Sequence, residues 1–255
     1  MVSKYFSGLS GLQLPVPKYE YPPEHQHRSR LSYYATFLNS IEINSSFYKI
    51  PIGKTVGRWA SSVPANFRFT FKLFKELTHC KFLEFNPDHI QKFIESINNV
   101  GEKQGCILVQ FPPSLTTSSI HRFESLLKHI RNTPGAREWK IAVEFRNNAW
   151  YQGEVFDILD ACNALLVIQD NPKSATPFNA PISNSVYIRF HGPTGNYRGG
   201  YSDEFLSEYA TYIRDWINEG KEVYTYFNNT AGDAYNNLVS LNRMMDEHSI
   251  QGYNK

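Results

Sequence analysis

Eight short runs rich in β-branched and aromatic residues recur along the chain, separated by segments of helical or loop character. The runs cover residues 4–7, 40–44, 67–73, 105–111, 140–146, 164–170, 185–191 and 222–229. Strands that alternate with helices indicate parallel βαβ units, and eight such units close into a TIM-type (β/α)8 barrel. Because 255 residues is also a usual length for one barrel, we predict a single α/β barrel domain over residues 1–255.

Apolar residues at helical spacing lie between most of the runs. Ile90, Phe93 and Ile97, for example, follow Asp88, which can cap the start of a helix. Comparable series occur within residues 123–130, 155–159, 205–216 and 234–241. Residues 171–184 are instead rich in Pro, Ser and Asn, so we expect a loop in place of the helix after the sixth strand.

Composition supports a large buried core and argues against several classes of protein. Hydrophobic residues make up 41% of the chain, and the net charge of +2 gives no broad basic surface for nucleic acid. Cys80, Cys106 and Cys162 are odd in number and lack C-x-x-C spacing, which argues against a disulfide framework and a structural zinc site. The sequence has neither a signal-like start nor an apolar run of about 20 residues, so we expect a cytoplasmic protein with no membrane partner. No pattern indicates the oligomeric state.

Polar side chains share one face of the predicted strands. Residues two apart on a strand point to the same side, so Glu42 and Asn44 lie opposite Ile41 and Ile43. The same alternation groups Glu144, Arg146, Tyr187, Arg189, His191, Tyr224, Tyr226 and Asn228, and late positions on other strands hold Lys72, Gln110 and Asp170. Helices that cover a parallel sheet need an apolar partner, so the polar face should line the barrel interior. These residues gather near the C-terminal strand ends, where barrel enzymes have their active sites.

Two interpretations of this polar set are open. Its three cations nominally balance its three carboxylates, so the set could be an internal network of ion pairs. Such a network is costly to desolvate, and apolar residues would usually stabilise the fold as well. We therefore favour a functional pocket over a purely structural network.

Basic residues on three strands suggest that the pocket takes an anion. Lys72, Arg146 and Arg189 would hold a phosphate or carboxylate group, the arginines through two parallel hydrogen bonds. Residues 191–201, rich in Gly and Tyr, could form a lid or a phosphate cradle. Further substrate contacts are expected from Asn44, Tyr48, His79, Gln110, Trp150, Asn228 and Asn229.

Acid/base chemistry is the predicted reaction type. Glu144 and His191 are the candidate proton carriers, since an imidazole titrates near ~6.5, and Glu42 and Asp170 would orient or tune them. A divalent metal held by these four residues is the less favoured alternative, because three interior cations oppose it. No nucleotide-binding or metalloprotease fingerprint is present, and we predict no cofactor.

A series of motifs resembles the YecE-like family, also catalogued as domain of unknown function family seventy-two. In chain order these motifs are residues 41–48 (IEINSSFY), 69–72 (FTFK) with His79, 109–113 (VQFPP), 144–146 (EFR) with Trp150, Asp170, 187–192 (YIRFHG) and 226–230 (YFNNT). The resemblance covers nearly the whole chain and implies a (β/α) barrel, but it carries no established activity. Where the family has G-T-S-G-W, residues 8–12 read GLSGL, without the threonine hydroxyl and the tryptophan.

Three functional hypotheses remain. The leading one is an enzyme, a hydrolase, lyase or isomerase, that acts on a small phosphorylated or carboxylated molecule. The second is a protein that binds or processes nucleic acid, with the same cations on phosphate and with Tyr48, Trp150, Tyr197 and Tyr201 stacked on bases. The near-neutral net charge argues against it. The third is a non-catalytic sensor that binds a ligand in the same pocket.

Overall fold

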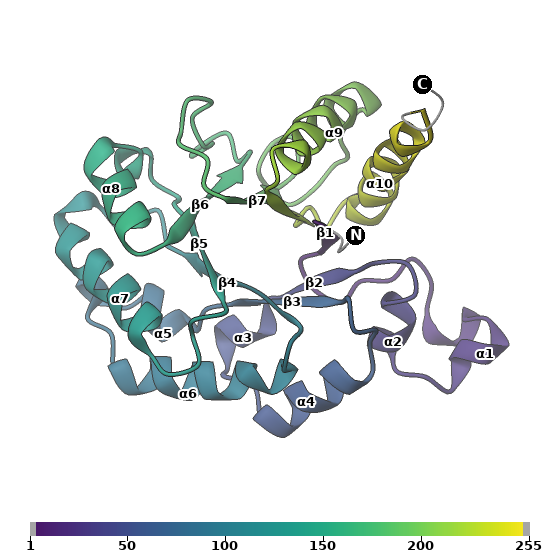
Figure 1. The fold of residues 1–255 in the computed structure, drawn as a ribbon, viewed down its shortest axis with the longest axis horizontal. Coiled ribbons are helices and arrows are strands. Elements are labelled where there is room, and N and C mark those ends of the chain that lie inside the picture. Colours follow the sequence, from purple (N-terminus) through teal and green to yellow (C-terminus); the bar gives the residue numbers. More distant parts are fainter. Residues whose placement is uncertain (1–3, 252–255) are drawn as a thin grey trace.

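The computed structural model, which describes residues 4–251, is a ring of eight parallel strands surrounded by helices (Figure 1). Each strand pairs with its neighbours in the order β1-β8-β7-β6-β5-β4-β3-β2. The strands are β1 (Tyr5–Leu9), β2 (Ser40–Ile43), β3 (Arg68–Lys72), β4 (Gln104–Gln110), β5 (Lys140–Glu144), β6 (Ala164–Gln169), β7 (Ser185–Phe190) and β8 (Glu222–Phe227). The predicted TIM-type barrel is confirmed, and every strand overlaps the run that predicted it.

Helices follow most strands and cover the outside of the ring. They are α1 (Pro23–Gln26), α2 (Arg30–Tyr34), α3 (Ser45–Tyr48), α4 (Gly53–Ser61), α5 (Lys75–Thr78), α6 (Pro87–Ile97), α7 (Ile120–Asn132), α8 (Gly153–Ala161), α9 (Asp203–Asn218) and α10 (Ala234–Gln251). Short 3-10 turns occur at Lys18–Glu20, Lys81–Leu83, Asn98–Val100, Thr117–Ser119 and Asn148–Trp150. Residues 170–184, between β6 and β7, contain no helix, as the Pro- and Asn-rich sequence predicts.

The ring closes between β1 and β2 largely through side chains. The Tyr34 hydroxyl, at the end of α2, donates to the Ser40 carbonyl at 2.9 Å and accepts from the Leu9 amide at 2.8 Å. The Asn39 amide similarly bridges to the backbone of β1. Gly8 permits this approach, because a Cβ at that position would overlap the Ser40 carbonyl oxygen. These side-chain contacts supplement a backbone hydrogen bond from the Gly11 amide to the Glu42 carbonyl at 2.8 Å.

Two apolar layers lie on opposite sides of the strands. Residues such as Ile41, Phe71 and Val143 face outward and pack with the helices in the larger core. The interior holds a smaller cluster made of Phe6, Cys106, Leu108, Ala142, Leu165, Val167, Tyr187, Tyr224 and Tyr226. The Tyr226 hydroxyl is hydrogen-bonded to Thr70 at 2.8 Å. This cluster fills the barrel interior, and the charged side chains lie on the side of it nearer the C-terminal strand ends.

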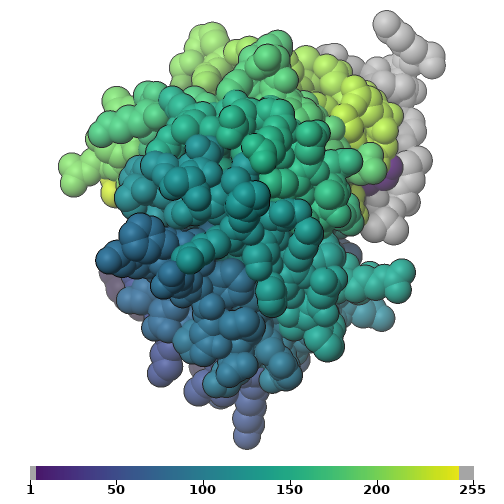
Figure 2. Space-filling model, turned by 90° about the vertical axis from the view of Figure 1, so that its left-hand side faces the viewer, coloured from purple at the N-terminus to yellow at the C-terminus, as the bar shows by residue number. Residues whose placement is uncertain are grey.

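The outer helices and loops give the barrel a continuous surface on the side that carries α7 and α8. Figure 2 shows side chains from the middle of the chain, in teal, packed between the blue N-terminal part and the green C-terminal part. Within residues 4–251, no helix combines the length and the hydropathy that a membrane span requires. The three cysteines are free thiols.

Candidate functional site

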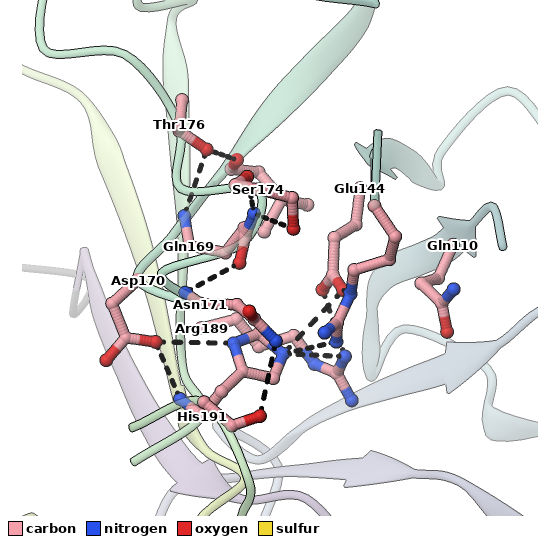
Figure 3. A network of polar contacts seen from close by, with 12 residues as sticks. Gln110, Glu144, Gln169, Asp170, Asn171, Ser174, Thr176, Arg189 and His191 are labelled. Atoms are coloured by element: carbon pink, nitrogen blue, oxygen red, sulfur yellow. Dashed lines mark hydrogen bonds and ion pairs between the residues drawn. The ribbon is translucent and has the colours of Figure 1, made fainter. Parts of the chain in front are cut away.

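Arg189 lies at the centre of the charged layer, with 1% of its surface exposed. Its guanidinium donates to both oxygens of Glu42, through Nη2 at 2.7 Å and Nε at 3.0 Å. Its Nη1 donates to Glu144 Oε2 at 2.9 Å (Figure 3). The Tyr187 hydroxyl donates to Glu42 Oε2, which also accepts from Arg189 Nε, at 2.5 Å. Because these residues come from β2, β5 and β7, one arginine ties distant strands of the barrel together.

The two carboxylates in this network are ionised. Burial alone would raise the pKa of Glu42 and of Glu144. The charge and hydrogen bonds of Arg189 outweigh burial at Glu42, and the charges of Arg146 and Arg189 do so at Glu144, so both pKa values are lowered. Arg146 Nε donates to the second oxygen of Glu144. Both oxygens of Glu144 therefore accept hydrogen bonds from guanidinium groups, whereas a proton carrier needs an oxygen that can reach the substrate.

His191 follows β7 and is fully buried. Its Nε2 lies 2.6 Å from Arg146 Nη2 and 3.4 Å from Arg189 Nη1. A guanidinium has only donors, so Nε2 must accept and the ring proton resides on Nδ1, which faces Asp170 Oδ1 at 3.3 Å. Burial lowers the pKa of His191, consistent with a neutral ring. The lone pair that a general base would use is thus bonded to arginine.

Asp170 lies behind His191 and anchors the loop after β7. Its Oδ1 also accepts from the His191 amide at 2.7 Å, and its Oδ2 accepts from the Tyr201 hydroxyl. Burial, followed by the charge of Asp170, raises the pKa of Tyr201, which therefore remains a donor. Asp170 is one residue beyond the inward register of β6, where Val167 and Gln169 point into the barrel. Asp170 therefore holds the backbone and the imidazole ring of His191 in place.

Gln169 is a polar residue of the site that strand alternation could have identified. It shares the parity of the interior residue Val167. Its side-chain oxygen accepts from the Asn171 amide at 2.9 Å and its amide group donates to the Ser174 carbonyl, so it folds the start of the 170–184 loop over the strand end (Figure 3).

A cavity of about 390 Å³ opens beside this network at the C-terminal strand ends. Its walls are formed by Asn44, Phe47, Tyr48, Lys72, Arg146, Arg189, Tyr197, Asn228 and Thr230. Phe47 and Thr230 were not among the predicted contacts, although both lie in the motifs 41–48 and 226–230. The structure thus brings six of the predicted ligand-binding residues to one cavity, together with two residues that sequence reasoning did not select.

Lys72 is the distinctive charge in this cavity. Its Nζ lies 4.3 Å from the centroid of the Phe47 ring. Among the described residues, no carboxylate lies within ion-pair distance of this amine, and it donates no side-chain hydrogen bond. Burial, followed by the positive charge of Arg189, lowers the pKa of Lys72 to about 8. Three cations and two carboxylates, Glu42 and Glu144, lie around the cavity, which leaves one excess positive charge.

Asn44 and Tyr48, two of the predicted ligand contacts, line the cavity. The Asn44 side-chain oxygen is buried and has no hydrogen-bond partner within the described part of the chain. Tyr48 is 70% exposed and stands at the cavity rim. The first is an unsatisfied acceptor position and the second an open aromatic face, so both are available to a ligand.

Four predicted contacts lie outside the cavity wall. His79 shares a hydrogen bond with Thr78 at 2.8 Å and packs edge-on against Phe47. The side-chain amide of Gln110 donates to the neighbouring carbonyl of Phe111. The amide of Asn229 donates to the carbonyl of Gly199 at 2.9 Å and holds the loop after β7. Trp150, the fourth, is the clearest departure from prediction.

Trp150 is fully buried in the outer apolar layer. It stacks on Phe145 with ring centroids 5.0 Å apart, and its indole N–H donates to the Leu115 carbonyl at 2.8 Å. Phe145 has the outward parity of β5, so the tryptophan follows it away from the barrel interior. Trp150 is therefore a core residue, available neither to a small ligand nor to a nucleic-acid base.

The described residues contain no group of three or more His, Cys, Asp or Glu side chains placed to hold a metal ion. Three of the four residues considered for a metal are bonded to guanidinium groups: Arg189 bonds Glu42 and Glu144, and Arg146 bonds Glu144 and His191. The fourth, Asp170, faces the Nδ1 atom of His191.

Fold and site together define a TIM-type barrel with an arginine-centred ion-pair network and a cation-rich cavity at its C-terminal strand ends. The chain belongs to the family described as protein of unknown function DUF72, whose family model matches residues 7–254. The predicted family resemblance is thereby confirmed.

Relatives support this assignment. The UPF0759 protein YunF of Bacillus subtilis is 22% identical over 89% of this chain and 90% of its own length, and the UPF0759 protein YecE of Escherichia coli is 26% identical over 48% of this chain and 43% of its own. The crystal structure of a DUF72 family protein from Enterococcus faecalis is 24% identical, has a TM-score of 0.78 and covers 95% of both chains. The structural likeness establishes the shared barrel fold.

Proposed function

We propose that this protein is an enzyme that binds a small phosphorylated or carboxylated molecule in the cavity beside Lys72 and acts on it by acid/base chemistry. The observation that carries the proposal is the Lys72 amine, a half-buried cation on the cavity wall without a carboxylate partner among the described residues. Buried charges are normally paired, so an unpaired cation inside a concave site favours an anionic ligand.

Arg146 supplies the second half of the anion site. Its Nε donates to Glu144 and its Nη2 donates to His191, so the plane of the guanidinium is fixed. Its Nη1 has no hydrogen bond to any described residue, and the side chain forms part of the cavity wall. An arginine that is already oriented loses little rotamer entropy when it binds a carboxylate or a phosphate.

The acid/base role moves from the predicted residues to Lys72. Both oxygens of Glu144 and the unprotonated Nε2 of His191 accept hydrogen bonds from arginine, and these contacts hold Arg146 in place. Lys72 lines the cavity and its pKa, lowered to about 8 by burial, lies near the range in which a group exchanges protons efficiently at neutral pH. We therefore assign Lys72 to proton transfer and the three-residue set Arg146, Glu144 and His191 to positioning.

Phosphate binding tests the anion site. A ligand that binds only the folded state raises its stability by RT ln(1 + [L]/Kd), which is about 2.7 kcal/mol at a hundredfold excess over Kd. We expect inorganic phosphate to raise the melting temperature of the wild-type protein more than chloride does at matched ionic strength, and to raise that of Lys72→Met much less. Lys75→Met is the matched control, because Lys75 is exposed on the neighbouring α5.

The comparison with the control separates site binding from general salt effects. Excluded anions stabilise proteins without binding to a site, and that contribution is the same in all three proteins. An equal phosphate shift in the wild type and in Lys72→Met would contradict the anion site. Saturable binding of phosphorylated or carboxylated sugars without turnover would favour the sensor hypothesis over the enzyme.

A further inference from the structure

We propose that the Lys72 amine is a nucleophile that forms an imine with an aldehyde or ketone bearing a phosphate or carboxylate group. The inference rests on the proposed anion site and deepens it, because it names the functional group of the ligand that reacts. It adds a covalent step to a residue that the proposed function uses only for charge and proton transfer.

The position of Lys72 suits covalent attack. It is the last residue of β3, and its backbone carbonyl accepts from the Ser46 hydroxyl at 2.6 Å, which fixes the strand end against α3. The amine lies over the Phe47 ring, on the wall of a cavity of about 390 Å³. That volume falls within the range of small-molecule sites, and the amine faces the space that the molecule would fill.

The surroundings of Lys72 increase the uncharged fraction of its amine relative to an ordinary lysine. Two guanidinium groups, Arg146 and Arg189, form part of the same cavity wall, and no carboxylate within the described residues pairs with the amine. Desolvation and a neighbouring cation are the two devices by which proteins activate a lysine nucleophile. Burial and the charge of Arg189 outweigh the charges of Glu144 and Glu42, which raise the pKa of Lys72, and bring it to about 8. At neutral pH the reactive fraction of Lys72 therefore exceeds that of an ordinary lysine by roughly two orders of magnitude.

Five other lysines within the described residues are held by partners of the protein itself. Lys140, Lys128 and Lys221 each form an ion pair with a glutamate at 2.6–2.7 Å. Lys103 donates to backbone carbonyls, and Lys4 donates to the Gly220 carbonyl at 2.8 Å. A nitrogen that is already held by a carboxylate or a carbonyl must leave that contact before it can attack a carbonyl carbon, so these side chains are less available for the reaction than Lys72.

The reaction balances without a redox partner. The nitrogen lone pair of the neutral amine attacks the carbonyl carbon, and a proton passes from nitrogen to oxygen to give a carbinolamine. The hydroxyl group then takes a proton from solvent and leaves as water, while the nitrogen lone pair forms the carbon–nitrogen double bond of an iminium that keeps its N–H. Arg146 Nη1 would hold the anionic group of the substrate while the iminium draws electrons from an adjacent C–H or C–C bond. This is chemistry of the lyase or isomerase type.

Reductive trapping tests the imine. Wild-type protein is incubated with pyruvate or glyceraldehyde 3-phosphate and with cyanoborohydride, which reduces the imine to a stable secondary amine. We expect one adduct for each chain, located on the peptide that contains Lys72, and a labelling rate that rises with pH through about 8. Lys75→Arg is the control and should label like the wild type.

Lys72→Arg distinguishes the imine from the anion site, because it keeps a positive charge but offers no primary amine. We expect this variant to lose the specific adduct and to retain the stabilisation by phosphate. Labelling spread over exposed lysines, or specific labelling that survives in Lys72→Arg, would overturn the imine. Labelling at Lys72 that is no faster with pyruvate than with acetone would instead contradict the proposed anion site and leave Lys72 as a nucleophile.

Discussion

Arg189 shows which properties of a residue the alternation of side chains along a strand predicts, namely the direction of its side chain, and which it does not, namely its ion-pair partners. The period of two along a strand fixes the side to which a side chain points, so the convergence of Glu42, Glu144 and Arg189 could be predicted. Which groups pair depends on side-chain rotamers across the barrel, and these do not follow from strand parity. Sequence reasoning therefore assigned Arg189 to the ligand, whereas its guanidinium is bonded to two glutamates.

Removal of Arg189 should be among the most destabilising substitutions of the interior. Arg189→Met leaves two buried carboxylates without their shared partner, and breaking a buried ion pair from one side costs about 3–5 kcal/mol. The matched control is Arg122→Met, which breaks the exposed pair with Glu84 and should cost at most about 1 kcal/mol. Urea unfolding measures both free energies. Similar small losses in the two variants would mean that the network contributes little to stability.

The side chains that join β1 to β2 are the feature that the sequence does not predict at the element scale. Strands and long helices have periodic apolar patterns, and β1 to β8 were all predicted from them. The short helices α1 to α5 are mostly too brief for such a pattern. At the seam between β1 and β2, the side chains of Tyr34 and Asn39 add to the backbone hydrogen bond between Gly11 and Glu42. Those contacts exist only once the two strands are adjacent.

Gly8 provides a test of the seam. Gly8→Ala would place a methyl group against the Ser40 carbonyl, and we expect a loss of about 1–3 kcal/mol from forced movement of the strands. Gly57→Ala is the control: a Cβ there meets only ordinary contacts at 3.8 Å or more, and alanine in the middle of α4 should stabilise by about 0.5–1 kcal/mol. Thermal unfolding of both variants decides. A neutral Gly8→Ala would show that the seam can widen.

In the barrel as a whole, the residues that form the packed interior and the residues that line the cavity lie at different levels along the barrel axis. Tyrosines and aliphatic residues fill the interior, and the ion-pair network and the cavity lie above them at the strand ends. Eight repeated units and a polar face were enough to predict this layout from the sequence. The identity of the ligand was not predictable, because it depends on which cations remain without a protein partner. Because Arg189 pairs with Glu42 and Glu144, Lys72 and the Nη1 edge of Arg146 are the groups left without a protein partner among the described residues.

The buried network also predicts how the stability of the molecule depends on pH. Burial lowers the pKa of His191, and arginine charges lower those of Glu42 and Glu144 despite burial. In the unfolded chain these groups titrate near about 6.5 and 4.3, so the unfolded state takes up protons first as the pH falls. The contribution of His191 is therefore complete above about 6.5 and decreases below it, and that of the glutamates decreases below about 4.3.

Substitution of the histidine separates these two stages. His191→Gln keeps an acceptor for Arg146 and removes one titrating group, so it should flatten the loss of stability between pH 6.5 and 5 by up to about 1.4 kcal/mol per pH unit. His79, whose pKa is also lowered, contributes equally to both proteins. The steeper loss below about pH 4.3 should remain, because Glu42 and Glu144 are unchanged. Urea unfolding across this pH range provides the measurement. Identical slopes above pH 5 would mean that His191 is already protonated in the folded protein, and its ring could then not accept the hydrogen bond from Arg146.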